Sequence, residues 1–192
     1  MAKGRFVIGV LLLGALAAPI WGSRAQAAEK PKKTVEKYFV PDVVLVNQDG
    51  TKIPLKKFLE TDRPVMLDFI YGTCTTICPV LSASFVNLQN RLGTDSRKIR
   101  LVSISIDPEN DSPKVMKEYM KRYRARSGWD FLSGTRSDID RVMYAFNAYI
   151  ANKMDHYPLT LIRYPGDGRW VRIDGLMSAS ELMEEYRKVS GK

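Results

Sequence analysis

Residues 64–79 read PVMLDFIYGTCTTICP, and this stretch decides the expected fold. After Pro64, residues 65–71 form a nearly continuous apolar run, which is typical of a strand covered on both faces in a parallel sheet. Cys74 and Cys78 follow, and Pro79 favours a helix start because proline is tolerated in the first turn and is costly further in. The stretch therefore predicts a buried strand and then a helix whose beginning carries two cysteines.

Strands and helices alternate on either side of this stretch. An apolar stripe between residues 81 and 92 predicts a helix that ends near Gly93, and residues 99–106 form a second apolar strand. The other predicted elements are a hairpin over 43–54 with an Asp49-Gly50 turn, a helical turn at 55–59, a helix capped by Ser112 and opened by Pro113, a strand at 129–132, a helix capped by Ser137 with Asp140, a hairpin over 159–173, and a last helix with a capping box of Ser178 and Glu181.

This order of elements predicts the fold class. Parallel units flanked by hairpins indicate an α/β domain, a thioredoxin-like three-layer sandwich with a central mixed sheet and an N-terminal β-hairpin. A reactive group directly after a parallel strand lies where open α/β sheets place their sites. The 192 residues are enough for a hydrophobic core, so the two cysteines are not needed merely to hold the domain together.

The N-terminal segment has the pattern of an export signal. Lys3 and Arg5 precede a mostly apolar stretch over residues 6–21, and an Ala-x-Ala site follows, so residues 1–27 are predicted to be a signal peptide. The alternative is an uncleaved anchor in the inner membrane, although the run is shorter than the ~20 residues that span a bilayer. Residues 28–38 are predicted to be a flexible tether, and residues 39–192 the domain. We expect a periplasmic or other extracytoplasmic location, where neighbouring thiols can form a disulfide.

The charge of the chain limits the partners. The formal net charge of +9 falls to +6 when Lys3, Arg5 and Arg24 leave with the signal peptide. Such a charge favours acidic partners or anionic lipid surfaces. The remaining basic residues are scattered singly or in short groups without a nucleic-acid-binding motif, so the sequence does not predict binding to nucleic acid.

Cys74 and Cys78 are the only cysteines, and His156 is the only histidine. Residues four apart on a helix have Cβ atoms roughly 5–6 Å apart, so the two sulfurs can share a metal ion or close a disulfide. Thiolates and an imidazole suit copper or zinc better than calcium or magnesium. Structural zinc usually takes four protein ligands, which cysteines and histidines of this chain cannot supply, so copper is the predicted metal.

A lone histidine such as His156 is more often a surface or hydrogen-bonded residue than a metal ligand. Its position favours the ligand role. His156 lies just before the strand expected at Leu159, and in a thioredoxin-like fold the loop entering that strand faces the helix with the cysteines.

Three motifs in this order resemble the Sco/SenC family. They are YGTC through ICP at residues 71–79, SISIDPENDSP at residues 103–113, and a lone His156 before a strand and an Asp-Gly turn. The likeness runs from about Phe39 to the C-terminal helix. The family consists of exported or membrane-tethered thioredoxin-like proteins implicated in copper delivery to the binuclear copper centre of cytochrome c oxidase.

The resemblance implies roles for individual residues. Cys74 and Cys78 correspond to the copper-binding and redox cysteines, and His156 to the third copper ligand. Asp107 matches an acidic position near the site that is not expected to be a ligand, and a turn that closes the strand explains it equally well. This chain departs from many family members in having Thr75, not proline, after the first cysteine.

Two functions from different classes follow. A copper metallochaperone would hold the ion through Cys74, Cys78 and His156 and pass it to a copper-receiving protein such as cytochrome c oxidase subunit II. A thiol-disulfide oxidoreductase would use Cys74 to attack a partner disulfide and Cys78 to resolve it, with a thiol reductant as a further partner and copper incidental. A structural disulfide in a binding module is the third interpretation.

Overall fold

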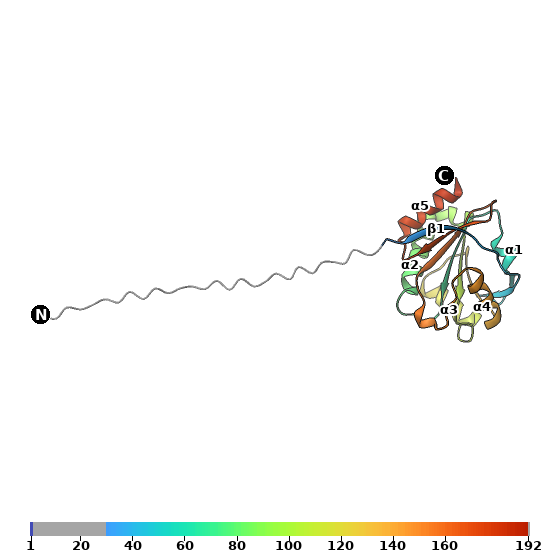
Figure 1. Ribbon diagram of the computed structural model, residues 1–192, viewed down its shortest axis with the longest axis horizontal. Coiled ribbons are helices and arrows are strands. Elements are labelled where there is room, and N and C mark those ends of the chain that lie inside the picture. The colour runs from blue at the N-terminus through green and yellow to red at the C-terminus, as the bar shows by residue number, and fades with distance from the viewer. Residues whose placement is uncertain (2–29, 192) are drawn as a thin grey trace.

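The computed structural model describes Met1 and residues 30–191. At its centre lies a mixed β-sheet (Figure 1). The strand order of this sheet is β1-β8-β7-β4-β5-β6-β2-β3. β4, β5 and β6 are parallel to one another, and all other neighbours pair antiparallel. The strands are β1 (Lys32–Lys37), β2 (Val44–Asn47), β3 (Lys52–Pro54), β4 (Val65–Ile70), β5 (Arg100–Ser105), β6 (Trp129–Ser133), β7 (Leu159–Arg163) and β8 (Arg169–Asp174).

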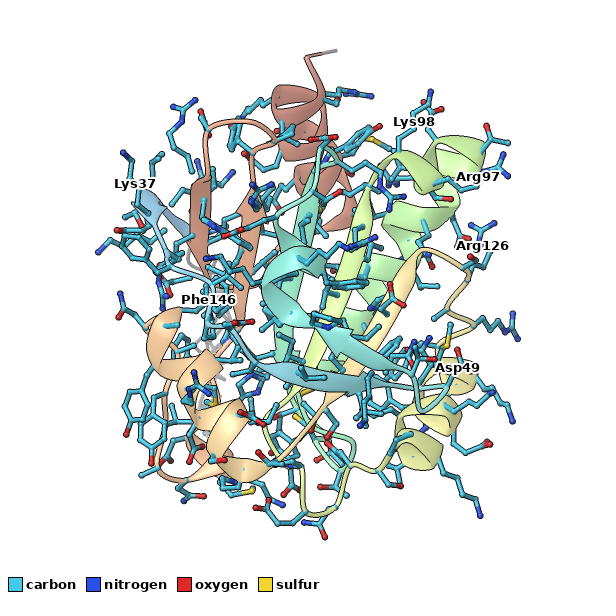
Figure 2. The ribbon with its side chains drawn as sticks, turned by 90° about the vertical axis from the view of Figure 1, so that its right-hand side faces the viewer. Lys37, Asp49, Arg97, Lys98, Arg126 and Phe146 are labelled. Carbon is cyan, nitrogen blue, oxygen red and sulfur yellow. The ribbon has the colours of Figure 1, made fainter. Side chains whose placement is uncertain are left out.

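Helices cover both faces of this sheet. In Figure 2, α1 and α4 lie in front of the sheet and α2 and α5 lie behind it. α3 shares the face of α2, since the hydroxyls of Ser82 on α2 and Tyr119 on α3 are 2.9 Å apart. The helices are α1 (Leu55–Leu59), α2 (Cys78–Leu92), α3 (Pro113–Arg122), α4 (Arg136–Ala145) and α5 (Ala179–Ser190), with 3₁₀ turns at Gly93–Lys98 and Lys153–Asp155. The predicted three-layer α/β fold is confirmed.

The strand predicted from the quoted stretch lies in the middle of the core. All six residues of β4 are buried, which explains why its sequence is a continuous apolar run and does not alternate. Its successive side chains point to opposite faces, so Phe69 reaches Phe146 beside α4 while Asp68 points to the face of α2. The loop after Ile70 leaves at the carboxyl end of the parallel strands.

Of the three N-cap residues predicted from the sequence, the structure confirms two. The Ser112 hydroxyl accepts from the backbone N–H of Val115, and Ser178 and Glu181 form the predicted capping box. The prediction of Ser137 as the cap of α4 is wrong. Thr135 caps this helix by accepting from the N–H of Asp138, so the helix begins one residue before Ser137.

The segment predicted to be a flexible tether is partly ordered. Lys32–Lys37 form strand β1, which pairs antiparallel with β8 at one edge of the sheet, so the prediction is wrong for these residues. A Lys-rich composition is compatible with an edge strand, where exposed lysines discourage pairing with a further chain. The predicted signal peptide lies almost entirely outside the described residues. None of the helices in the described part is both long and apolar enough to span a membrane.

Candidate metal centre

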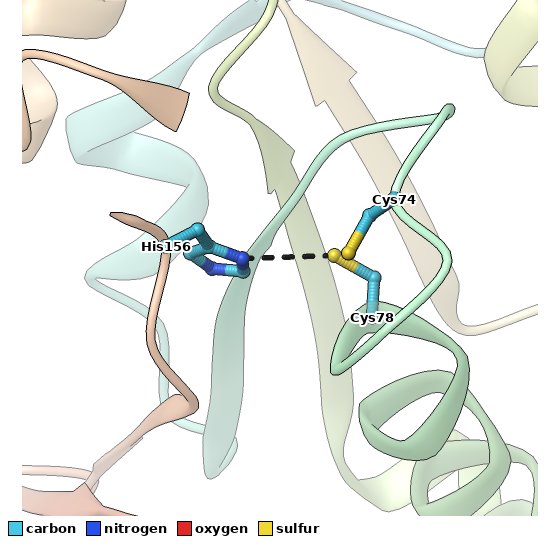
Figure 3. A group of neighbouring side chains, drawn as sticks. All are labelled: Cys74, Cys78 and His156. Atoms are coloured by element: carbon cyan, nitrogen blue, oxygen red, sulfur yellow. Dashed lines mark hydrogen bonds between the residues drawn. The ribbon is translucent and has the colours of Figure 1, made fainter. Parts of the chain in front are cut away.

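Cys74, Cys78 and His156 come together at the carboxyl end of β4. Cys74 lies in the loop after β4, Cys78 is the first residue of α2, and His156 follows the 3₁₀ turn Lys153–Asp155 that leads into β7 (Figure 3). One donor atom from each of the three side chains lies within 4.8 Å of the other two. Cys78 Sγ is 3.7 Å from His156 Nδ1. The three residues singled out from the sequence therefore form one cluster.

Cys74 is the more acidic of the two thiols. Its side chain is mostly buried, its backbone N–H donates to the carbonyl of Tyr71, and its sulfur is 3.6 Å from the Thr76 hydroxyl. Burial opposes ionisation, but hydrogen bonding with Cys78 and with the backbone of Cys78 and Thr76 lowers the pKa of Cys74 to about 7. Cys74 is therefore substantially a thiolate near neutral pH and can act as a nucleophile or a metal ligand.

Cys78 behaves differently. It is completely buried, and this burial, together with the neighbouring Cys74, raises the pKa of the Cys78 thiol. Both cysteines are free thiols in this structure. Cys78 is the first residue of α2, a helix without a side-chain N-cap, and its backbone N–H donates to the Cys74 sulfur. Cys74 thus ionises first, and Cys78 keeps its proton until a metal or a disulfide replaces it.

His156 presents a neutral imidazole to the thiols. Burial lowers the pKa of His156 to about 4 against a weaker opposing effect of the Phe69 backbone. The Nδ1 atom faces Cys78, whereas the buried Nε2 atom has no hydrogen-bond partner among the described residues. The Tyr71 ring packs edge-on to the imidazole with centroids 6.0 Å apart. At neutral pH the imidazole of His156 is therefore uncharged, and its Nε2–H tautomer offers the Nδ1 lone pair to a metal ion.

Asp111 fixes the loop that carries Cys74. Its two carboxylate oxygens accept from the N–H of Gly72 at 3.2 and 2.9 Å, and one of them also accepts from the Ser105 hydroxyl. The same Ser105 oxygen accepts from the N–H of Asp107. Sequence reasoning assigned no role to Asp111 or Ser105. Asp111 lies six residues beyond the end of β5, but no sequence pattern shows that its carboxylate is bonded to Gly72 in another loop.

Replacing Gly72 by alanine is expected to lower the free energy of unfolding by about 1–3 kcal/mol. A Cβ atom at this position would come within 2.6 Å of Asp111 Oδ1, and the carboxylate is held in place by Ser105. Urea unfolding measures the loss. In an Asp111→Ala background the same change should cost less, because the clash is gone. Equal costs in the two backgrounds would contradict this account of the loop.

Asp107 stands beside the cluster without joining it. Its buried carboxylate pairs with Lys153 Nζ at 2.5 Å and accepts from the Asn110 amide, and its carbonyl accepts from the N–H groups of Asn110 and Asp111. These contacts close the strand end as a turn. A turn of this kind is the alternative explanation that the sequence offered for Asp107.

Comparison with known proteins places the chain in a family. The family model described as SCO1/SenC matches residues 31–186. The chain belongs to the SCO1/SenC family. A SCO1 protein homolog of Bacillus subtilis is 34% identical over 116 residues, which are 59% of this chain and 59% of the relative, so the match spans about three fifths of that relative's length.

Solved structures of Sco proteins share the fold. BsSco, described as a Sco-family protein with a disulfide switch, superposes with a TM-score of 0.69 at 28% identity, covering 83% of this chain and 98% of BsSco. ScoI of Bradyrhizobium japonicum, solved with copper bound, superposes with a TM-score of 0.65 at 23% identity, covering 79% of this chain and 99% of ScoI. The expected thioredoxin-like Sco fold and the resemblance to the SCO1/SenC family are confirmed.

Proposed function

We propose that this chain is an extracytoplasmic copper metallochaperone that binds one copper ion through Cys74, Cys78 and His156. The observation that carries the proposal is the convergence of the three donor atoms within 4.8 Å. Two sulfurs and a neutral imidazole nitrogen form a donor set of the soft to borderline kind that copper prefers. Membership of the SCO1/SenC family and the copper-bound ScoI relative support the same conclusion.

The chain's own residues would prepare the site for metal. Cys74, with its lowered pKa, offers a thiolate at once, and the buried Cys78 thiol releases its proton as its sulfur binds the ion. Among the described cysteines, histidines and carboxylates, the cluster includes no fourth residue. An ion held by three donors leaves room for a ligand from a receiving protein, so the ion can leave by stepwise ligand exchange.

The receiving protein belongs to the proposal as well. BsSco is described as a member of a family of cytochrome c oxidase assembly proteins. We propose that this chain likewise delivers copper to a respiratory oxidase, with subunit II as the natural recipient. The predicted signal peptide of residues 1–27 would export the domain to the compartment outside the cytoplasm. The copper site of the proposed recipient, subunit II, faces the same compartment.

The redox state of the cysteines provides the test. Reduced protein incubated anaerobically with Cu(I) and then desalted should retain one copper ion per chain. Protein first oxidised to the Cys74–Cys78 disulfide should retain none, because both sulfur donors are then consumed. Copper is counted by atomic absorption against protein concentration. Equal copper retention by the reduced and oxidised forms would rule out the proposed site.

A second candidate function is thiol-disulfide exchange, and the unequal acidity of the two thiols favours it. The Cys74 thiolate would attack a partner disulfide and release one partner thiol, and Cys78 would then displace the second thiol as the Cys74–Cys78 disulfide forms. The protein is oxidised by two electrons and the partner is reduced by two. The two functions differ in their need for His156, which only the copper site uses.

A further inference from the structure

Met154 is an exposed thioether on the same turn as His156. It lies in the 3₁₀ turn Lys153–Asp155, and its side chain is 71% exposed. Its backbone is fixed, because the N–H of Met154 donates to the side-chain oxygen of Asn152 at 3.0 Å. The turn therefore carries an exposed, polarisable sulfur two residues before His156.

The Tyr71 hydroxyl connects this sulfur to the cluster. Tyr71 Oη lies 3.7 Å from Met154 Sδ, and the Tyr71 ring packs against the imidazole of His156. Burial and hydrogen bonding with the neighbouring Cys74 thiol raise the pKa of Tyr71 to about 12, so the hydroxyl keeps its proton. The hydroxyl thus borders both the Met154 thioether and the Cys74 sulfur.

Lys153, the cationic residue of the same turn, already has an ion-pair partner. Lys153 Nζ pairs with Asp107 and lies over the Tyr71 ring at 5.6 Å from its centroid. This arrangement keeps the ammonium on the Asp107 side of Tyr71. Met154 is then the exposed soft donor of this turn, and thioethers favour Cu(I).

We propose that Met154 is a transient Cu(I) ligand at the entrance of the site, an inference that rests on the proposed copper function. Its thioether takes the ion from an external donor and passes it to Cys74, Cys78 and His156, and it takes part again when the ion leaves. Each step exchanges one ligand for another without electron transfer. The proton that the Cys78 thiol still carries goes to solvent as its sulfur binds.

A transient ligand lowers the barrier equally in both directions. Met154→Leu keeps an apolar side chain of similar size and removes the sulfur. We expect this variant to take up and release Cu(I) about tenfold more slowly, with the equilibrium affinity unchanged. Zinc should enter at the wild-type rate, because zinc sites in proteins are built from cysteine, histidine and carboxylate ligands and not from thioethers.

The experiment uses the full reduced chain and stopped-flow exchange with a chromophoric Cu(I) chelator, in both directions. Met183→Leu, a methionine substitution on α5, is the matched control and should behave as wild type. Slower Cu(I) exchange with unchanged affinity and unchanged zinc uptake supports the proposal. Unchanged Cu(I) rates, or equal slowing of both metals, overturns it. A wild-type chain that binds no copper overturns the proposed function itself.

Discussion

Replacing His156 by alanine is expected to weaken Cu(I) binding at least about 100-fold. The imidazole supplies one of three donors, and its Nδ1 atom already faces the sulfur of Cys78 at 3.7 Å. Because burial holds the pKa of His156 at about 4, the nitrogen is unprotonated at neutral pH and its full donor strength is lost in the variant. Competition with a chelator of known Cu(I) affinity measures the change.

Asp155→Ala is the control for that substitution. Asp155 is an exposed neighbour on the same turn and is not part of the metal cluster, so its replacement should leave copper affinity within about twofold of wild type. The rate at which Cys74 reacts with a disulfide should be similar in all three proteins. If His156→Ala binds copper as tightly as wild type and reduces disulfides normally, thiol exchange becomes the better account of the site.

The second large predicted effect concerns the carboxyl group of Asp68 and the stability of the fold. This carboxyl in the middle of β4 is completely buried, and neither oxygen has a hydrogen-bond partner among the described residues. Burial raises the pKa of Asp68 to about 7, against a weaker opposing effect of Ser103 on the neighbouring strand. In the unfolded chain the same group titrates near 4.

Between about pH 4 and pH 7 the folded protein therefore keeps a proton on Asp68 that the unfolded chain has already released. Stability falls as the pH rises through that interval and levels off above it. Asp68→Asn, which mimics the neutral acid, removes this contribution. We expect the free energy of unfolding of the variant, relative to wild type, to increase by about 3 kcal/mol between pH 5 and pH 8.

Urea unfolding of both proteins across this pH range tests the expectation. The difference between the two proteins is the useful quantity, because every other titrating group is common to both and cancels. A difference that does not change with pH would show that Asp68 ionises normally in the folded protein. Copper binding by Asp68→Asn serves as a check that the site at the end of β4 is intact.

Elements with strong local patterns were predictable from the sequence. The uninterrupted apolar run identifies β4, and the proline near the second cysteine identifies the start of α2. Strand β1 was missed because its Lys-rich sequence resembles a tether, and only pairing with β8 gives it order. The cap of α4 was misplaced because serine and threonine occur together, and only the backbone geometry selects Thr135.

The cluster itself was also predictable, because parallel-strand ends and the loop entering β7 meet at one edge of the sheet. The supporting contacts were not. The tie between Gly72 and Asp111 and the ion pair between Asp107 and Lys153 join loops far apart in sequence, and their partners depend on side-chain placement. The same holds for Met154, whose nearness to Tyr71 has no counterpart in a sequence pattern.

X-ray absorption spectroscopy of the Cu(I)-loaded, reduced protein tests the central claim most directly, because it counts the atoms bound to the metal. The proposed site predicts two sulfur scatterers and one imidazole nitrogen for the wild-type protein, and loss of the imidazole signal alone in His156→Ala. A spectrum with sulfur scatterers only, identical in the wild-type and His156→Ala proteins, would contradict a copper site built from Cys74, Cys78 and His156.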